Sequence, residues 1–403
     1  MIDGGHKNVY VPHLRPRIEA IRKAREIEDQ EPLQVDLLMV SHVDDDHMQG
    51  ILEMTKELIT ADMDNDPQLV QVLSLWHNSF ENLIDHTPKE LTAAFKGQFG
   101  AASVAGELPN DLTLDADEDE ETIVSNLKVL ASIPQGAQLR KDAERLDFPL
   151  NPEFDGKLIL AKKKGKPIDM DHGLKFTVVG PLLPELKKLH AKHVAWLKEL
   201  KKAGKTPAEV LAAYIDKSVH NLSSIVVLAE AGGKSMFLTG DARGDKILKG
   251  LELVGLVKEG GSMHVDVLKV PHHGSANNLD DDFFERITAD HYVFSGNGEH
   301  GNPERKALEM LLQARGNDDY TVHLTYPIDE LDVDRKKDWA IEQKKEKKKK
   351  ETKPSQVVRP NWSRKKHSLA ALFEDNPKFK KKVSLIEEDE EPHVIDLLDE
   401  VGF

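Results

Sequence analysis

Cysteine is absent from the 403 residues of the chain. This absence excludes disulfide bonds, thiolate metal sites and a cysteine nucleophile. Any bound metal ion must therefore be held by imidazole and carboxylate groups, which suit zinc, manganese or iron better than copper(I).

Long apolar runs and an excess of positive charge are also lacking. No stretch approaches the roughly 20 apolar residues that a membrane helix needs. The first residues, MIDGGHKNVY, have neither the basic start nor the apolar core of a signal peptide. We therefore expect a cytoplasmic protein without a membrane partner. The formal net charge of −16 does not attract phosphate groups in bulk, but bound metal ions reverse the sign of the charge at a site.

The order of the predicted elements indicates a layered α/β fold. An apolar run with branched residues, Leu33–Ser41, predicts a buried strand, and Gly50–Leu58 predicts a helix. Residues from about 59 to 170 are mostly polar with a helical pattern, and we interpret them as a helical insertion. Further strands are predicted at Leu174–Val179, Ser224–Glu230, Ser235–Leu238, Val265–Val270 and His291–Ser295. Strands that repeatedly end in His or Asp, with helices between them, predict a sheet with a site along one edge.

The composition changes at Asp334, where Lys and Glu begin to dominate. We therefore divide the chain into a domain at 1–330 and a charged C-terminal linker or tail at 331–403, with a short helix near Leu369–Phe373. The run Lys344–Lys350 contains a glutamate and no aromatic residue. That composition favours a solvated linker over binding to nucleic acid or to anionic lipid.

Two histidines frame three aspartates in the run His42-Val43-Asp44-Asp45-Asp46-His47. The run follows a predicted buried strand, so it lies on a strand-to-helix turn, where functional residues are often found. Side chains on such a turn can surround two metal ions about 3.5–4 Å apart that share a bridging hydroxide. The alternative is a solvated acidic loop with incidental histidines. Acidic loops are common, but this arrangement directly after a buried strand is not, and we favour the metal site.

The segment SHVDDDHMQG resembles the His-x-His-x-Asp-His signature of the metallo-β-lactamase superfamily, with Asp44 in place of the second histidine. That variant resembles the branch typified by the DNA-uptake protein ComEC. Three other segments resemble motifs of the same family in the same order: Ile2–Gly5 (IDGG), Phe237–Asp241 (FLTGD) and Leu268–Ser275 (LKVPHHGS). The resemblance covers about residues 1–315. It implies a four-layer αβ/βα sandwich and two divalent metal ions, zinc or manganese.

The resemblance also implies which residues bind these ions. His42 and Asp44 would hold the first ion, and Asp46 and His47 would hold the second. Asp46 would have a second, catalytic role, because in this family the aspartate of the Asp-His pair accepts the proton of the attacking water or protonates the leaving group.

Three later positions would complete the two sites. Asp241 would bridge the ions, and one of His272 and His273 would complete the second site. The superfamily usually supplies a third ligand of the first ion from a histidine near His220, but the ComEC-type branch tends to have asparagine there. We therefore expect Asn221 to orient the substrate.

Two residues near the motifs have both a functional and a structural interpretation. His300, in the loop SGNGEHGNP, is our second catalytic candidate, because it could donate a hydrogen bond to a phosphate or transition-state oxygen. Its alternative role is that of a surface-loop histidine. Asp3 would hydrogen-bond a metal ligand and fix its orientation, or it is simply a turn residue before Gly4.

The function that we predict is hydrolysis by metal-activated water, with a small-molecule or nucleic-acid-type phosphodiester as the substrate. The alternatives are hydrolysis of an ester, thioester or lactam, and a degenerate site that serves as a non-catalytic scaffold. The superfamily usually has strands before the Asp-Gly motif, so the sequence leaves two alternatives: N-terminal strands are missing because the start is misassigned, or the first sheet is short. The sequence leaves the oligomeric state open.

Overall fold

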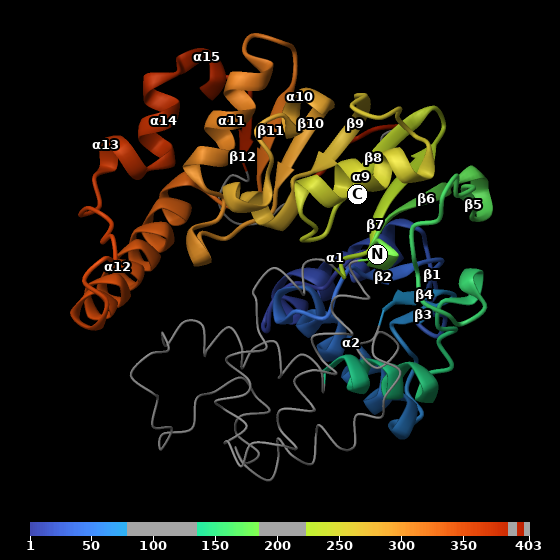
Figure 1. Ribbon diagram of the computed structural model, residues 1–403. Helices are drawn as coiled ribbons and strands as arrows, with labels where there is room; N and C mark the ends of the chain where they lie inside the picture. Colours follow the sequence, from blue (N-terminus) through green and yellow to red (C-terminus); the bar gives the residue numbers. More distant parts are fainter. Residues whose placement is uncertain (79–134, 185–222, 386–392, 399–403) are drawn as a thin grey trace, which may run out of the picture. The chain divides into compact units, whose positions relative to one another are not determined.

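The computed structural model describes residues 1–78, 135–184, 223–385 and 393–398 (Figure 1). The chain divides into two compact units, both of which contain helices and strands, so the fold is mixed α/β. Unit 1 comprises Met1–Leu160, Pro181–Ile225 and Val401–Phe403, and unit 2 comprises Ala161–Gly180 and Val226–Glu400.

Unit 1 is built around two pairs of short parallel strands, β1 with β3 and β2 with β4. The bounds of its elements are η1 Tyr10–Leu14, α1 Arg15–Ala24, β1 Leu33–Val35, β2 Leu38–Val40, α2 Asp45–Asp64, β3 Val70–Val72, β4 Leu75–His77 and η3 Pro152–Phe154. The strand predicted from Leu33 to Ser41 is thus divided into β1 and β2. The segment that we expected to be a helical insertion also contributes β3 and β4, and its residues 79–134 lie outside the described part of the chain.

Burial explains the division into β1 and β2. In β1, buried Leu33 and Val35 flank exposed Gln34, so one face of the strand is in contact with solvent. Every residue of β2 is buried, as expected for a strand that is covered on both faces. The chain stays buried through Ser41, His42 and Val43 before it enters α2.

Helix α2 packs closely against the N-terminal segment of the chain. Its buried residues Met48, Ile51, Met54 and Leu58 recur every three or four positions and form one apolar face. Gly50 lies on the same helix, and a Cβ atom added there would lie 1.9 Å from the carbonyl oxygen of Gly4. Only a glycine at this position allows the N-terminal segment to approach the helix so closely.

Unit 2 contains an eight-stranded mixed sheet with the strand order β12-β11-β10-β9-β8-β7-β6-β5 (Figure 1). The strand bounds are β5 Ile168–Asp169, β6 Lys175–Gly180, β7 Val226–Ala231, β8 Lys234–Leu238, β9 Met263–Lys269, β10 Ile287–Phe294, β11 Thr321–Leu324 and β12 Val383–Leu385. Each neighbouring pair from β8 to β12 is parallel, and each neighbouring pair from β5 to β8 is antiparallel. All five strands predicted from Leu174 onward are present, as β6 to β10, with ends shifted by a few residues.

Helices connect the parallel strands of unit 2. Their bounds are α9 Gly244–Val254, α10 Phe283–Arg286, α11 Arg305–Arg315, α12 Ile328–Thr352, α13 Arg364–His367, α14 Leu369–Asp375 and α15 Pro377–Lys380, and the 3-10 turns are η4 Asp171–Gly173, η5 Pro271–Gly274, η6 Ala276–Asn278 and η7 Glu299–Gly301. The short helix expected near Leu369–Phe373 is α14. Because β8, β9 and β10 are parallel, the loops that follow them emerge at the same edge of the sheet.

His77, at the end of β4, is fully buried in unit 1. Its backbone N–H donates to Asn151 Oδ1 and its carbonyl accepts from Asn151 Nδ2, both at 2.9 Å. Neither ring nitrogen makes a hydrogen bond within the part of the chain that the structure describes. Burial lowers the pKa of His77 to about 4, because the charged imidazolium would lose its hydration.

A helix that crosses a bilayer needs about 20 mostly apolar residues. None of the helices formed by the described residues is sufficiently long and apolar to cross a membrane.

Gly50→Ala tests the close packing of α2. Alanine favours a helix more than glycine does, so the substitution would stabilise an isolated helix by ~1 kcal/mol. Here the new methyl group overlaps the Gly4 carbonyl, and we expect the free energy of unfolding to fall by ~1–3 kcal/mol. Denaturant unfolding measures the change. Thr60→Ala, at an exposed position of the same helix, should change stability by less than about 0.5 kcal/mol. Equal effects of the two substitutions would contradict the packing argument.

His77→Leu tests the buried imidazole. Between pH 6.5 and about 4 the unfolded state binds a proton at His77 that the folded state excludes, so stability falls as the pH falls through this window. The contribution is fully present above pH 6.5, and its loss amounts to on the order of 3 kcal/mol. Thermal unfolding at a series of pH values should therefore show a shallower acid dependence for the variant. Parallel curves for variant and wild type down to pH 4 would show that His77 does not resist protonation.

Candidate metal centre

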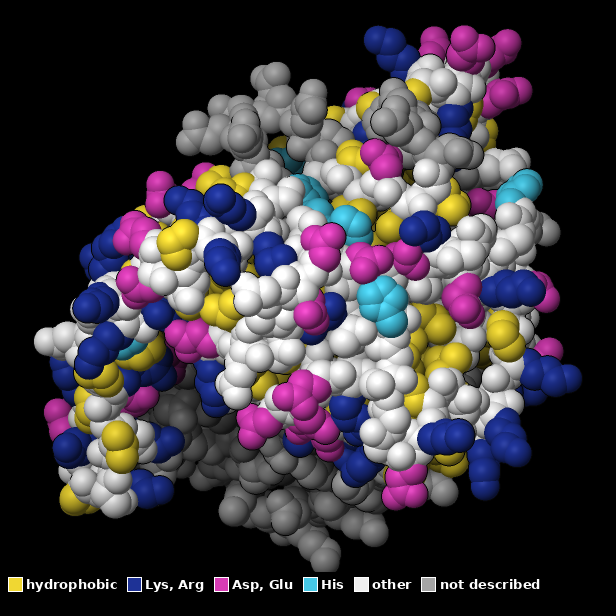
Figure 2. Space-filling model, turned by 90° about the horizontal axis from the view of Figure 1, so that it is seen from above, with side chains coloured by type: hydrophobic (Ala, Val, Ile, Leu, Met, Phe, Trp, Pro, Cys, Tyr) yellow, Lys and Arg dark blue, Asp and Glu magenta, His cyan; other side chains and the backbone are white. Residues whose placement is uncertain are grey.

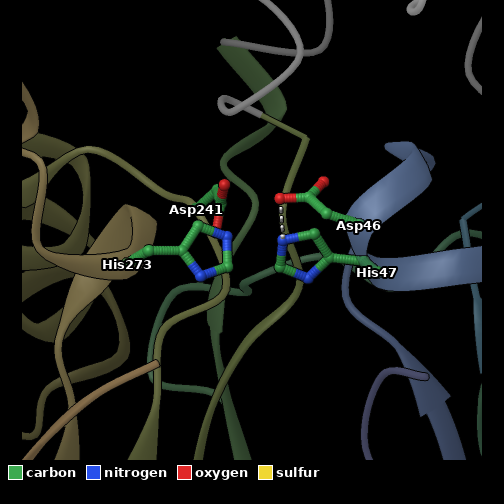
Figure 3. A group of neighbouring side chains, drawn as sticks. All are labelled: Asp46, His47, Asp241 and His273. Carbon is green, nitrogen blue, oxygen red and sulfur yellow. Dashed lines mark ion pairs between the residues drawn. The ribbon is translucent and has the colours of Figure 1, made fainter. Parts of the chain in front are cut away.

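Unit 1 brings four of the predicted ligands to the end of β2 and the first turn of α2. His42 follows β2, Asp44 is the N-cap residue of α2, and Asp46 and His47 lie in its first turn (Figure 3). The rings of His42 and His47 are 4.1 Å apart between centroids, and both residues are buried. The sequence motif thus becomes a compact group because the helix begins immediately after the strand.

The two carboxylates of this group lie beside the two imidazoles. Asp44 Oδ2 is 3.4 Å from His42 Nε2, and Asp46 Oδ2 is 3.7 Å from His47 Nε2 (Figure 3 shows Asp46 and His47). An N-cap aspartate ordinarily accepts hydrogen bonds from the first backbone amides of its helix. The side chain of Asp44 makes no such cap bond, so its position serves the group around His42 rather than the helix terminus.

Asp3 and Ser41 form hydrogen bonds with the two histidines. The Asp3 carboxylate accepts from the Ser41 backbone N–H at 2.7 Å and from the Ser41 hydroxyl at 2.9 Å. His47 Nδ1 lies 2.8 Å from Asp3 Oδ2, and His42 Nδ1 lies 3.1 Å from Ser41 Oγ. The Asp3 carboxylate therefore contacts the His47 ring, and the Ser41 hydroxyl contacts the His42 ring, in each case at Nδ1.

These contacts determine the tautomer of both histidines. An ionised carboxylate only accepts hydrogen bonds, so His47 Nδ1 must carry the proton that it donates to Asp3. The Ser41 hydroxyl gives its only hydrogen to Asp3 and therefore accepts from His42 Nδ1–H. In each neutral ring the lone pair is then on Nε2, the nitrogen that lies beside Asp44 or Asp46. This is the usual arrangement of metal-binding histidines, in which an outer carboxylate orients the ring.

The ionised state of Asp3 is itself stabilised by this arrangement. Burial alone would raise the pKa of Asp3, but the His47 imidazole and the hydrogen bonds from His47 and Ser41 outweigh burial and lower it. Asp3 therefore remains an anion that holds the two rings at neutral pH.

Unit 2 brings together the other three predicted ligands at one edge of its sheet. Asp241 follows β8, and His272 and His273 lie in η5 after β9. His273 Nε2 is 3.6 Å from Asp241 Oδ1, and His272 Nε2 is 3.7 Å from Asp241 Oδ2 (Figure 3 shows Asp241 and His273). Nδ1 of His273 lies 3.3 Å from the Ser295 carbonyl, which only accepts, so this ring also has its lone pair on Nε2.

The loop that carries Asp241 is attached to the end of β9. Thr239 Oγ1 donates to the Lys269 carbonyl at 2.6 Å, and Lys269 Nζ donates to the Gly240 carbonyl at 3.1 Å. The Lys269 ammonium also lies 4.0 Å from Asp241 Oδ1 and offsets part of the charge of that buried carboxylate. The parallel pairing of β8 with β9 thus sets the position of Asp241 relative to η5.

The backbone of η5 is in an unfavourable conformation. His272 and His273 have φ angles of 49° and 54°, and Gly274 follows at 87°. The left-handed region costs a residue with a Cβ roughly 1–2 kcal/mol, and glycine adopts it freely. Two successive histidines in this region are more typical of a functional site than of a structural turn.

Of the remaining predicted site residues, the structure describes His300. His300 is exposed on η7, where its own φ is 54°. His220 and Asn221 lie outside the described residues, so the expected substrate-orienting role of Asn221 remains a prediction.

Asp46 and His47 in unit 1, and Asp241 and His273 in unit 2, are side chains of the described residues that could hold a metal ion. All four are imidazole or carboxylate groups, the donor types that zinc and manganese accept. Within each unit the histidine presents Nε2 to the neighbouring carboxylate, and the donor set therefore fits a divalent metal ion.

Ser41 and Lys269 contribute to these groups but were not selected from the sequence. Ser41 directly precedes His42, and a small hydroxyl residue at the end of a buried strand could have indicated its role. Lys269 is one residue of a predicted apolar strand, and nothing in its sequence environment distinguishes it from an ordinary surface lysine.

Comparison with known proteins gives partial similarities only. No family model matches the chain. It is similar to microtubule-associated protein 1A of Rattus norvegicus, 32% identical over 116 residues, which are 28% of this chain and 4% of that protein. The human protein of the same name is 31% identical over 113 residues, with the same coverage of 28% and 4%. ComE operon protein 3 of Bacillus subtilis (strain 168) is 31% identical over 98 residues, 24% of this chain and 12% of that protein. The chain thus matches only a small part of each of these proteins.

Asp3→Asn tests whether Asp3 orients the histidines. The amide keeps the shape of the side chain but loses the anion that receives the His47 proton, so we expect the affinity of the protein for zinc to fall about 10–100-fold. Titration of the metal-free chain with zinc in a calorimeter measures this change. Asp36→Asn, an exposed aspartate between β1 and β2, is the matched control and should leave the affinity unchanged.

The metal-free protein gives a second measurement on the same variant. Because the folded-state pKa of Asp3 is lowered from 3.8, the stability that the carboxylate contributes is present above this pH and is lost as the pH falls through the folded-state pKa. The difference in thermal stability between wild type and Asp3→Asn should therefore shrink in acid. An unchanged zinc affinity would mean that Asp3 serves the fold alone, and a pH-independent stability difference would contradict the lowered pKa of Asp3.

Proposed function

We propose that the protein is a metal-dependent phosphodiesterase with the four-layer αβ/βα sandwich of the metallo-β-lactamase superfamily. The proposed hydrolase domain comprises residues 1–330, with two divalent ions, zinc or manganese. The ligands assigned to them are His42, Asp44, Asp46 and His47 in unit 1, with Asp241 and His273 in unit 2. We prefer His273 to His272 because its ring is oriented by Ser295 and is the less exposed of the two.

One observation supports this proposal more than any other. The chain of contacts from His42 through Ser41 and Asp3 to His47 directs two neutral Nε2 lone pairs toward two carboxylates. A purely structural histidine pair has no need of a largely buried anion beside it, and removing that anion from most of its hydration costs free energy. The partial similarity to ComE operon protein 3 supports the same family.

The chemistry follows from the groups that are present. Divalent ions, when bound, supply Lewis acidity and lower the pKa of water toward neutrality. Asp46 is partly exposed at the start of α2, and its carboxylate is the group that we propose accepts the proton of the attacking water and returns it to the leaving oxygen. His300, exposed on η7, donates a hydrogen bond to a phosphate oxygen of the substrate.

A phosphodiester is the preferred substrate because of the charge balance. The protein carries a formal charge of −16, and three of its six candidate ligands are carboxylates. Two divalent ions would reverse that sign locally and allow an anionic substrate to bind. A neutral ester or lactam gains less from this reversal, and it is the alternative substrate class.

A non-catalytic interaction role is the second candidate function. The similarity to microtubule-associated protein 1A favours it, because that protein is named for its association with microtubules. In this case the His and Asp residues would form a degenerate site on a binding module. The metal content and the activity of the full chain distinguish the two functions.

Asp46→Ala tests the proposal directly. The full chain, loaded with manganese, should contain two metal ions and hydrolyse bis-p-nitrophenyl phosphate in preference to p-nitrophenyl acetate. Removal of the proposed proton acceptor should lower kcat by ~10²–10⁴-fold. Because Asp46 and Asp241 are both assigned ligands, Asp46→Ala and Asp241→Ala should each lower the metal content as well as the rate.

Asp45→Ala is the matched control, because Asp45 lies in the same helical turn but accepts a hydrogen bond from Gln49. It should retain activity within about twofold. If no metal binds at saturating supply, or if Asp45→Ala and Asp46→Ala lose activity equally, the hydrolase is ruled out and the interaction role is favoured.

A further inference from the structure

Charge is strongly segregated in the C-terminal part of unit 2. Residues 335–366 contain fourteen basic and four acidic side chains, a formal charge of +10 in a chain whose total is −16. These residues span most of α12 and α13. Lys and Arg side chains gather along the left edge of Figure 2, the side on which Figure 1 shows α12 to α14.

The exposed lysines of α12 lie on one side of the helix. At 100° per residue, the exposed lysines fall within an arc of about 160°. They are Lys336, Lys337, Lys344, Lys347, Lys348 and Lys350, and we call this surface the lysine face. Two of them interact locally, Lys337 with Asp334 and Lys347 with Gln343, but such exposed contacts are weak. Of the acidic residues between 335 and 352, only Glu351 falls within the arc.

Glu342 and Glu346 lie on α12 outside the arc of the lysine face. Glu346 accepts from the backbone and side chain of Arg359, at 2.6 and 2.9 Å, and Glu342 lies 3.8 Å from the same guanidinium. Gln343 and Trp339 donate to the carbonyls of Arg359 and Pro360 on the same side. The returning chain thus covers and neutralises the acidic side of α12 and leaves the lysine face exposed.

The N-terminal half of α12 is hydrogen-bonded to η7, the turn that contains His300. Arg335 Nε donates to the Gly301 carbonyl at 3.1 Å, and Arg335 also donates to the His367 carbonyl. Asp332 accepts from the backbone amides of Leu369 and Ala370. The lysine face therefore begins within one helical turn of a residue that contacts η7, and its orientation within unit 2 is set by buried contacts.

We propose that the lysine face binds the sugar–phosphate backbone of duplex nucleic acid without sequence preference. From Lys336 to Lys350 the helix extends about 21 Å, and one strand of a duplex presents a phosphate about every 3.4 Å along the axis, so the six lysines match about six phosphates. Backbone contacts of this kind carry affinity but no sequence information.

The arrangement of the aromatic residues near α12 favours duplex over single-stranded nucleic acid as the ligand. Binding of single strands relies on aromatic side chains on which bases stack. The aromatic residues near α12 are already stacked on one another and on arginine: Trp339 on His367 at 4.2 Å and beneath Arg359 at 5.0 Å, and Trp362 beneath Arg335 at 5.7 Å. We choose nucleic acid over other polyanions because of the proposed phosphodiesterase function, on which this choice rests. That the lysine face binds polyanions follows from its charge and exposure alone.

The test uses the full chain and a fluorescein-labelled 30-base-pair DNA duplex, with EDTA present, and measures anisotropy over a range of salt concentrations. Lys336, Lys344, Lys347 and Lys348 are changed together to Gln, which keeps helix propensity. We expect the affinity to fall at least about thirtyfold at 0.1 M salt. The slope of log K against log salt should become shallower by about 0.9 for each phosphate that the variant no longer neutralises.

The matched control changes Lys162, Lys163, Lys164 and Lys166 to Gln. These four lysines are also exposed, lie in unit 2 and alter the net charge equally. This variant should bind within about threefold of wild type. Equal losses of affinity in the two variants, absence of duplex binding, tighter binding of a single strand, or equally tight binding of poly-glutamate would each overturn the proposal.

The experiment also separates this inference from the proposed catalytic function. Binding in EDTA needs no metal ion, so Asp46→Ala should bind the duplex as wild type does. The small substrate bis-p-nitrophenyl phosphate does not reach along α12, so the lysine-face variant should hydrolyse it at the wild-type rate. Loss of duplex binding in Asp46→Ala would contradict the assignment to the lysine face.

Discussion

The largely buried carboxylate of Asp3 is the interaction on which the candidate site of unit 1 depends. It connects the N-terminal segment with the end of β2 and the start of α2 through Ser41 and His47. A buried anion is costly unless it is fully hydrogen-bonded, and here the bonds that satisfy it also orient two imidazoles. The close approach of Gly4 to Gly50 brings the carboxylate within reach of the helix. Packing and site chemistry are therefore consequences of the same contact.

Much of this arrangement could be predicted from the sequence. The strand before His42, the helix after it and the strands that end at Asp241 and η5 were all identifiable from apolar runs bounded by polar loops. The strands β3 and β4 were not, because three residues are too few to show an alternating pattern. The role of Ser41 was also missed, since the contact with Asp3 joins residues 38 positions apart. Tertiary contacts of this kind leave no local pattern.

The C-terminal region shows the same limit more clearly. Its lysines and glutamates lack an apolar stripe, and we therefore interpreted the run Lys344–Lys350 as part of a linker. The structure has a 25-residue helix, α12, there. The partners that stabilise it are Arg359 and Pro360, beyond the end of the helix, and Leu369, which is capped by Asp332. Glu346, the glutamate within the run, accepts hydrogen bonds from Arg359.

The central claim is that the two oriented histidines of unit 1 bind metal through Nε2. The most direct measurement is the imidazole ¹⁵N spectrum of the full chain before and after the addition of zinc, with His42 and His47 assigned by substitution. The account predicts that Nδ1 of both rings is protonated in both spectra and that only the Nε2 resonances move when zinc binds. Unchanged Nε2 resonances at saturating zinc, or metal binding at Nδ1, would contradict it.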